Sequence, residues 1–81
     1  MRDDPITQTK QLGIALKAAR KSHSLRQTDL AVRSGLLPKT ISLLENNPAA
    51  CSVDTLFRAL SSLNLEISIK PRGKNSVEEA W

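Results

Sequence analysis

Apolar residues recur at helical spacing in four segments of the 81-residue chain. The first three segments cover about residues 9–22, 27–34 and 38–46, and the fourth follows Ser52. In each of them the apolar side chains lie three or four positions apart, which places them on one face of an α-helix. The sequence therefore predicts an all-α bundle of four to five helices.

Residues with special backbone preferences mark where these helices begin and end. Gly35 can adopt a positive φ at the end of the second helix, and Pro38 suits the first turn of the third. Ser52 is a good N-cap for the fourth helix, and Asn64 tolerates the left-handed conformation that closes it. We expect the fourth helix to bury one apolar stripe. Its members are Val53, Leu56, Phe57, Leu60 and Leu63.

Residues 65–70 show a different period, with Leu65, Ile67 and Ile69 alternating with polar residues. This pattern predicts a short β-strand, but a single strand leaves its own backbone groups unpaired. Our hypothesis is that it pairs with the same segment of a second chain across a two-fold axis. The alternative is a tail that packs on the helices or stays mobile.

The sequence thus divides into four parts. Residues 1–8 read as a polar leader and residues 9–64 as the helical domain. Residues 65–70 form the expected dimerisation strand, and residues 71–81 are polar enough that we expect a disordered tail.

The net charge of +4 is carried by the N-terminal half, with +3 in residues 1–23 and +1 in residues 24–50. A basic surface favours a polyanionic partner such as nucleic acid. Only Phe57 and Trp81 are aromatic, so the core must be aliphatic.

The chemistry of the remaining residues argues against several classes of protein. One cysteine, Cys51, and one histidine, His23, make neither a disulfide nor a metal site. No spacing brings together a nucleophile, a base and an orienting group, so we expect no enzyme and no cofactor. No apolar run resembles a signal or membrane segment, and we expect a cytoplasmic protein without a membrane partner.

Residues 27–46 match the helix-turn-helix pattern. Small Ala31 lies where two helices must cross closely, and Gly35 makes the turn four residues later. The apolar positions below the turn complete the pattern. They are Leu30, Leu36, Ile41 and Leu44. An ordinary helical hairpin with a chance glycine is the alternative.

The stretch "LRQTDLAVRSGLLPKTISLLENN" resembles the Cro/C1 (Xre) class of transcriptional regulators. With "ENNPAACSVDTLFRALSSLNLEISIK" and a C-terminal Trp81, the chain is similar to the HipB-type antitoxins. The resemblance implies a lambda-repressor-like bundle that forms a homodimer, binds a palindromic double-stranded operator and represses its own operon. It also implies that the protein neutralises a HipA-like serine/threonine kinase toxin, with Trp81 as a candidate toxin contact.

At about 100° per residue, we expect Leu37, Ile41 and Leu44 to face inward. The opposite face of the third helix should then face outward. We expect direct base contacts from that face and phosphate contacts from Gln27. The candidate DNA-binding residues are Gln27, Leu37, Pro38, Lys39, Thr40, Ser42, Leu43 and Asn46. For Leu43, contact with thymine methyl groups and simple exposure remain open alternatives.

Relatives in the Cro/C1 class pair residues at the positions of Arg20 and Glu45, which predicts a structural ion pair between the first and third helices. Two other functions remain open at this point. One is a Cro/C1-type repressor without a toxin partner. The other is a protein-interaction module that has lost DNA binding, because Pro38 and Leu43 offer DNA no hydrogen-bonding side chain.

Overall fold

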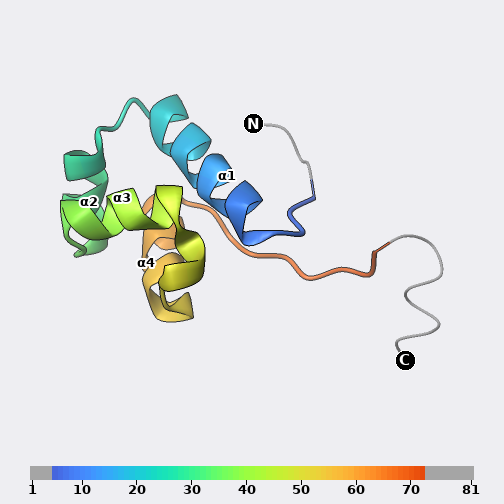
Figure 1. Cartoon of the computed structure of the whole chain (residues 1–81). Helices are drawn as coiled ribbons and strands as arrows, with labels where there is room; N and C mark the ends of the chain where they lie inside the picture. Colours follow the sequence, from blue (N-terminus) through green and yellow to red (C-terminus); the bar gives the residue numbers. More distant parts are fainter. Residues whose placement is uncertain (1–4, 73–81) are drawn as a thin grey trace.

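The computed structural model describes residues 5–72 and shows a bundle of helices followed by an extended segment (Figure 1). The four α-helices fall where the sequence pattern predicts them. Their bounds are α1 (Thr9–Ser22), α2 (Gln27–Ser34), α3 (Pro38–Asn46) and α4 (Val53–Ser62). A 3₁₀ turn, η1 (Pro48–Ala50), which the pattern did not predict, joins α3 to α4.

The helix ends confirm the assignments made from local sequence. Gly35 takes φ +72° after α2, and Asn64 takes φ +57° after α4. Pro38 occupies the first turn of α3. The Ser52 Oγ atom accepts a hydrogen bond of 3.1 Å from the backbone N–H of Thr55, which caps α4.

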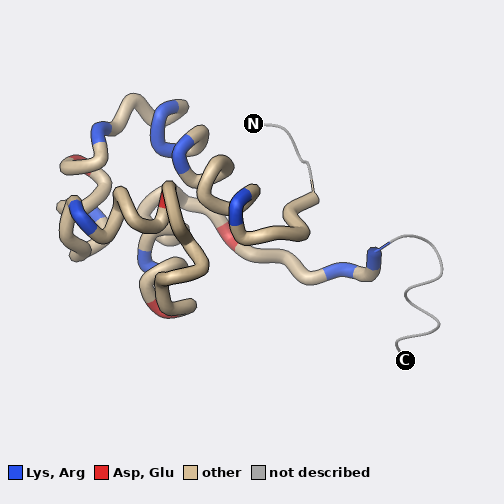
Figure 2. Tube along the Cα trace, viewed as in Figure 1, with Lys and Arg blue, Asp and Glu red and all other residues tan. Residues whose placement is uncertain are grey.

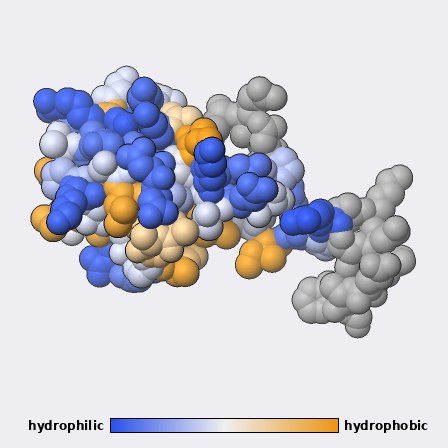
Figure 3. Space-filling model, viewed as in Figure 1, coloured by the Kyte–Doolittle hydropathy of each residue, from blue (hydrophilic) through white to orange (hydrophobic). Residues whose placement is uncertain are grey.

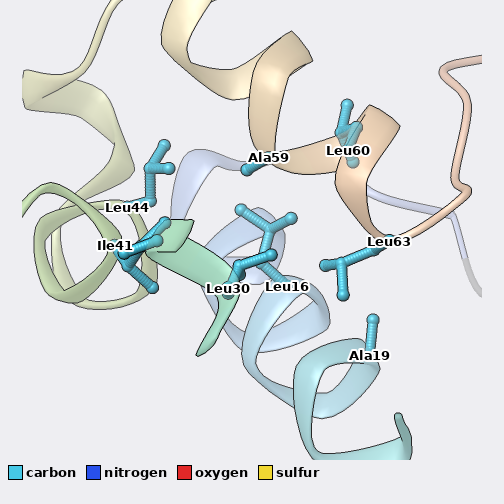
Figure 4. Close-up of a cluster of buried hydrophobic side chains, with 9 residues drawn as sticks. Leu16, Ala19, Leu30, Ile41, Leu44, Ala59, Leu60 and Leu63 are labelled. Atoms are coloured by element: carbon cyan, nitrogen blue, oxygen red, sulfur yellow. The ribbon is translucent and has the colours of Figure 1, made fainter. Parts of the chain in front are cut away.

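The core is built from aliphatic side chains that all four helices direct toward the centre (Figure 4). It contains Leu16, Ala19, Leu30, Ala31, Ile41, Leu44, Ala59, Leu60 and Leu63. No aromatic side chain belongs to this cluster among the described residues. Such a core stabilises the fold by the burial of methyl and methylene groups, and it fixes the directions in which α1, α2 and α3 can cross.

The prediction of one buried stripe along α4 is wrong for Val53 and Phe57. Leu60 and Leu63 are buried, but Val53 is 66 % exposed and Phe57 is 47 % exposed. Helix α4 packs against α2, and Leu56, one turn before Leu60, is half-buried against the core. Helical periodicity identifies which side chains share a face, but not how far a neighbouring helix covers it.

Residues 65–70 carry no β-strand in the part of the chain that the structure describes. Leu65 is half-buried against the core, and its backbone N–H donates to the Leu60 carbonyl at 2.8 Å. Beyond it the chain leaves the helices, and Ile69 is 96 % exposed (Figure 1). The strand pairing expected from the sequence therefore stays a prediction.

Two further properties concern the described residues 5–72. No helix there is long and apolar enough to span a membrane. No three His, Cys, Asp or Glu side chains come together in a way that would hold a metal ion. Cys51 lies half-buried between η1 and α4, and His23 is exposed at the end of α1.

Candidate nucleic-acid interface

Helices α2 and α3 are joined by a tight turn that holds them at a close crossing. The backbone N–H of Leu36 donates to the Ala31 carbonyl at 3.1 Å, across the left-handed Gly35. The Ala31 side chain is buried, so the small residue lies where the crossing requires it. This turn leads directly into α3 and decides which of its faces turns away from the core.

The two faces of α3 separate as the helical count predicts. Ile41 and Leu44 are buried in the core, whereas Lys39 and Asn46 are exposed. Leu43 is 40 % exposed on the outward face, and Ser42 beside it is half-buried. The structure therefore brings four of the candidate DNA-binding residues together on one accessible surface.

The inward orientation predicted for Leu37 is wrong. Leu37 is the N-cap of α3, with extended φ and ψ of −84° and 150°, and it is 67 % exposed. The angle of 100° per residue applies only inside a helix, so it misplaces a residue just before the first turn. Leu37 and exposed Pro38 thus lie at the leading end of the outward surface, while Thr40 is half-buried at its side.

Arg20 on α1 and Glu45 on α3 form the expected ion pair within the protein. Arg20 Nε lies 2.6 Å from Glu45 Oε2, and Arg20 Nη2 lies 3.1 Å from Glu45 Oε1. Arg20 Nη1 also donates to the Leu25 carbonyl at 2.8 Å. The hydrogen bonds that the Arg20 guanidinium donates to Glu45 raise the pKa of Arg20 above its ordinary value. The bonds of Arg20 therefore fix α3 against both α1 and the α1–α2 turn.

Gln27, the first residue of α2, belongs to the same network. Its Nε2 atom donates to Glu45 Oε1 at 3.1 Å, and its side chain is half-buried. Sequence reasoning missed this hydrogen bond, since the two residues lie on different helices and only the crossing brings them together. The bond uses one of the two amide hydrogens, and the phosphate contact expected from Gln27 stays a prediction.

An exposed ion pair stabilises the start of α2. The Asp29 carboxylate accepts a hydrogen bond of 2.8 Å from the backbone N–H of Arg26 and two of 3.1 Å from its guanidinium. These bonds lower the pKa of Asp29 below its ordinary value. A carboxylate in the first turn also interacts favourably with the helix dipole.

Basic residues are distributed along α1, the α1–α2 turn and the α2–α3 unit (Figure 2). Lys39 lies at the outward face of α3 and forms no ion pair among the described residues. The surface around α3 therefore combines a positive side chain with small polar groups. Such a surface is suited to phosphates and to base edges.

A glycine-hinged pair of helices with an outward second helix defines the class of helix-turn-helix proteins. The comparison with known families agrees with this assignment, because the helix-turn-helix family model matches residues 16–69. Among curated proteins, the chain is 39 % identical over 70 residues to antitoxin HipB of Escherichia coli O6:H1, covering 86 % of this chain and 73 % of that protein. It is 37 % identical over 59 residues to antitoxin HipB of Escherichia coli K12, covering 73 % and 67 %.

Solved structures lead to the same family. The chain matches a HipA–HipB–O2–O3 complex with a TM-score of 0.82 and 33 % identity, covering 86 % of this chain and 99 % of that one. It matches a HipB–O4 20-mer complex with the same TM-score, identity and coverage. The chain belongs to the HipB-type antitoxins of the Cro/C1 helix-turn-helix family, and it is a DNA-binding antitoxin.

Proposed function

We propose that the protein represses its own operon by binding a palindromic operator and that it neutralises a HipA-like serine/threonine kinase. The observation that carries the DNA-binding part is the outward face of α3, which the buried Arg20–Glu45 pair holds in place. The relatives' names support the partners, because they describe HipB in complexes with operator duplexes and with HipA.

In this proposal α3 enters the major groove with its N-terminal end foremost. Lys39, Ser42 and Thr40 supply hydrogen bonds to bases, and Leu37 and Pro38 add apolar contact at the leading end of α3. Gln27 and the free N–H groups at the starts of α2 and α3 bind phosphates and set the register. With few hydrogen-bonding side chains available, DNA shape contributes to selectivity as well.

A palindromic operator requires two copies of α3 related by a two-fold axis. Residues 65–70 are the segment that we assign to dimerisation, through Leu65, Ile67 and Ile69. Support comes from the exposure of Ile69 and from hydrophobic surface where this segment leaves the helices (Figure 3). Pairing two such segments would satisfy backbone groups and cover these side chains at once.

Binding of the kinase is the part of the proposal that depends most on family membership. Trp81, the candidate toxin contact, lies outside the described residues. A large aromatic side chain is a frequent anchor in protein interfaces, which is why we retain it in the proposal. A protein with these partners acts where the chromosome lies, in the cytoplasm.

The test is a mobility-shift assay with the DNA upstream of the protein's own gene and with a shuffled duplex of the same composition. We expect a shift with the upstream duplex that weakens steeply as salt is added. A second assay captures the kinase encoded beside the gene on the immobilised antitoxin. A shift without capture indicates a repressor that has no toxin partner, and capture without a shift indicates an interaction module.

A further inference from the structure

Ser42 and Asn46 lie one turn apart on the outward face of α3 and are hydrogen-bonded to each other. Asn46 Nδ2 donates to the Ser42 carbonyl at 2.8 Å and to the Ser42 Oγ atom at 3.3 Å. A backbone carbonyl can only accept, so the NH₂ group of the amide must be the one that faces Ser42. The Asn46 Oδ1 atom is therefore held on the other side, as an acceptor on the exposed surface.

The Ser42 hydroxyl differs from those of three other helical serines. Ser22, Ser34 and Ser62 each donate to a backbone carbonyl three or four residues earlier, at 2.8 to 2.9 Å. Among the described residues, the Ser42 hydroxyl accepts a hydrogen bond from Asn46 and donates none. Its hydrogen remains available as a donor, directly beside the Asn46 acceptor.

Leu43 adds an apolar group to this pair. Its side chain is 40 % exposed on the outward face of α3. Around the helix axis, Ser42 lies about 40° to one side of Asn46 and Leu43 about 60° to the other, at about 100° per residue. The surface therefore presents a donor, an acceptor and methyl groups in that order.

We infer that Ser42, Asn46 and Leu43 form a unit that selects one A·T base pair in each half of the operator. Adenine presents the N7 acceptor beside the N6 amino donor, and the thymine methyl group lies further along the same edge. Ser42 Oγ donates to N7, Asn46 Oδ1 accepts from N6, and Leu43 contacts the methyl group. This assignment rests on the proposed DNA-binding function and adds the identity of one recognised base pair.

The contact of Leu43 with the thymine methyl group distinguishes recognition of an A·T pair from recognition of a G·C pair. The O6 and N4 atoms of a G·C pair also place an acceptor beside a donor, so the two polar groups alone do not decide between them. Cytosine carries a hydrogen where thymine carries its methyl group, and an exposed leucine gains only from the methyl. The bond between Asn46 and Ser42 also exists before DNA binds, which reduces the conformational entropy lost on recognition.

The first experiment selects binding sites from a library of duplexes with a randomised central segment, using the full-length protein. We expect a symmetric consensus with one invariant A·T pair in each half-site. Ser42→Ala and Asn46→Ala should each relax that position and no other, and Ser61→Ala on α4 should leave the consensus unchanged. Thermal melting of each variant verifies that it is folded.

The outcomes separate the inference from the proposed function. If the unaltered protein enriches no sequence, the proposed function fails and the inference fails with it. If it enriches a consensus that lacks the A·T pair, or if the two variants retain full stringency at that position, only the inference is overturned.

The second experiment uses the unaltered protein, so it does not depend on any variant folding. At the A·T position of the selected duplex, adenine is replaced by 7-deazaadenine, or thymine by uracil. We expect each replacement to weaken binding roughly tenfold, and the same replacements at a position outside the consensus to have no effect. Unchanged affinity with 7-deazaadenine would remove Ser42 from base recognition, and unchanged affinity with uracil would remove Leu43. Either result overturns the unit as assigned.

Discussion

Gly13 on α1 lies directly against the backbone carbonyl of Glu45 on α3. A methyl group at Gly13 would stand 2.5 Å from the Glu45 oxygen and 3.2 Å from the Leu44 oxygen. Two turns further along α1, Arg20 binds the side chain of the same Glu45. Helix α1 therefore holds the C-terminal half of α3 by its main chain and by its one buried charge.

Replacing Gly13 with Ala should lower the free energy of unfolding by about 1–3 kcal/mol, because the neighbouring atoms are backbone and cannot move independently. Urea denaturation measures this change. Gly35 is the matched control, since it needs its positive φ and a Cβ there meets nothing within 4 Å. Gly35→Asn should be tolerated better than Gly35→Ala, whereas Gly13→Asn should be no better than Gly13→Ala. An unfolding free energy of Gly13→Ala equal to that of the unaltered protein would contradict the close contact at Gly13.

The Arg20–Glu45 pair predicts a strongly non-additive double-mutant cycle. Arg20→Met or Glu45→Leu alone should cost about 3–5 kcal/mol, because each leaves one buried charge without its partner. The double variant should cost much less than the sum of the two, since no buried charge remains. Chemical denaturation of the four proteins gives the coupling energy. If the two single costs simply add, the coupling energy is zero and Arg20 and Glu45 do not stabilise the fold as a pair.

Lys39→Ala should lower operator affinity by about 1–3 kcal/mol and leave thermal stability unchanged, because its side chain is exposed and lies on the outward face of α3. Lys17→Ala on α1 removes the same charge elsewhere and should have a smaller effect, since salt screens distant charges. Fluorescence anisotropy with a labelled operator measures both variants. An affinity loss of the same size for both would indicate general electrostatics and would remove Lys39 from the recognition surface.

The Arg26–Asp29 pair makes stability depend on pH in a defined direction. The pKa of Asp29 is lowered in the folded protein, so its contribution is present above the unfolded-state value of about 3.9. That contribution is lost as the pH falls through the lower folded-state pKa. Asp29→Asn should therefore be less stable at neutral pH and should lose less stability on acidification. Melting temperatures between neutral and acidic pH provide the measurement, and parallel pH curves for the two proteins would refute the linkage.

Ile69→Asp should prevent dimer formation without unfolding the helices, because Ile69 is 96 % exposed and lies in the segment proposed to pair. Analytical ultracentrifugation at micromolar concentration should show a dimer for the unaltered protein and a monomer for the variant. Val32→Asp, at an exposed position on α2, is the control and should remain dimeric. If the unaltered protein sediments as a monomer, the proposed strand pairing is excluded.

The helices could be predicted from the sequence because the rules that place them are local. A cap such as Ser52, a proline in a first turn and a glycine with positive φ act within a few residues of themselves. The position of Glu45 opposite Arg20 followed from a resemblance to a known family rather than from such rules. Leu37 shows where a local rule stops, since the helical angle no longer applies one residue before the helix.

Local sequence alone thus determined that four helices form, where each begins and ends, and that a small residue and a glycine lie at the crossing of α2 and α3. Only the tertiary structure decided that Gly13 touches Glu45, that Gln27 donates to it, and that Phe57 remains partly exposed. The physical reason is that periodicity and capping depend on neighbours within one or two turns of the chain. Contacts between helices depend instead on their crossing geometry, which residues distant in sequence establish together.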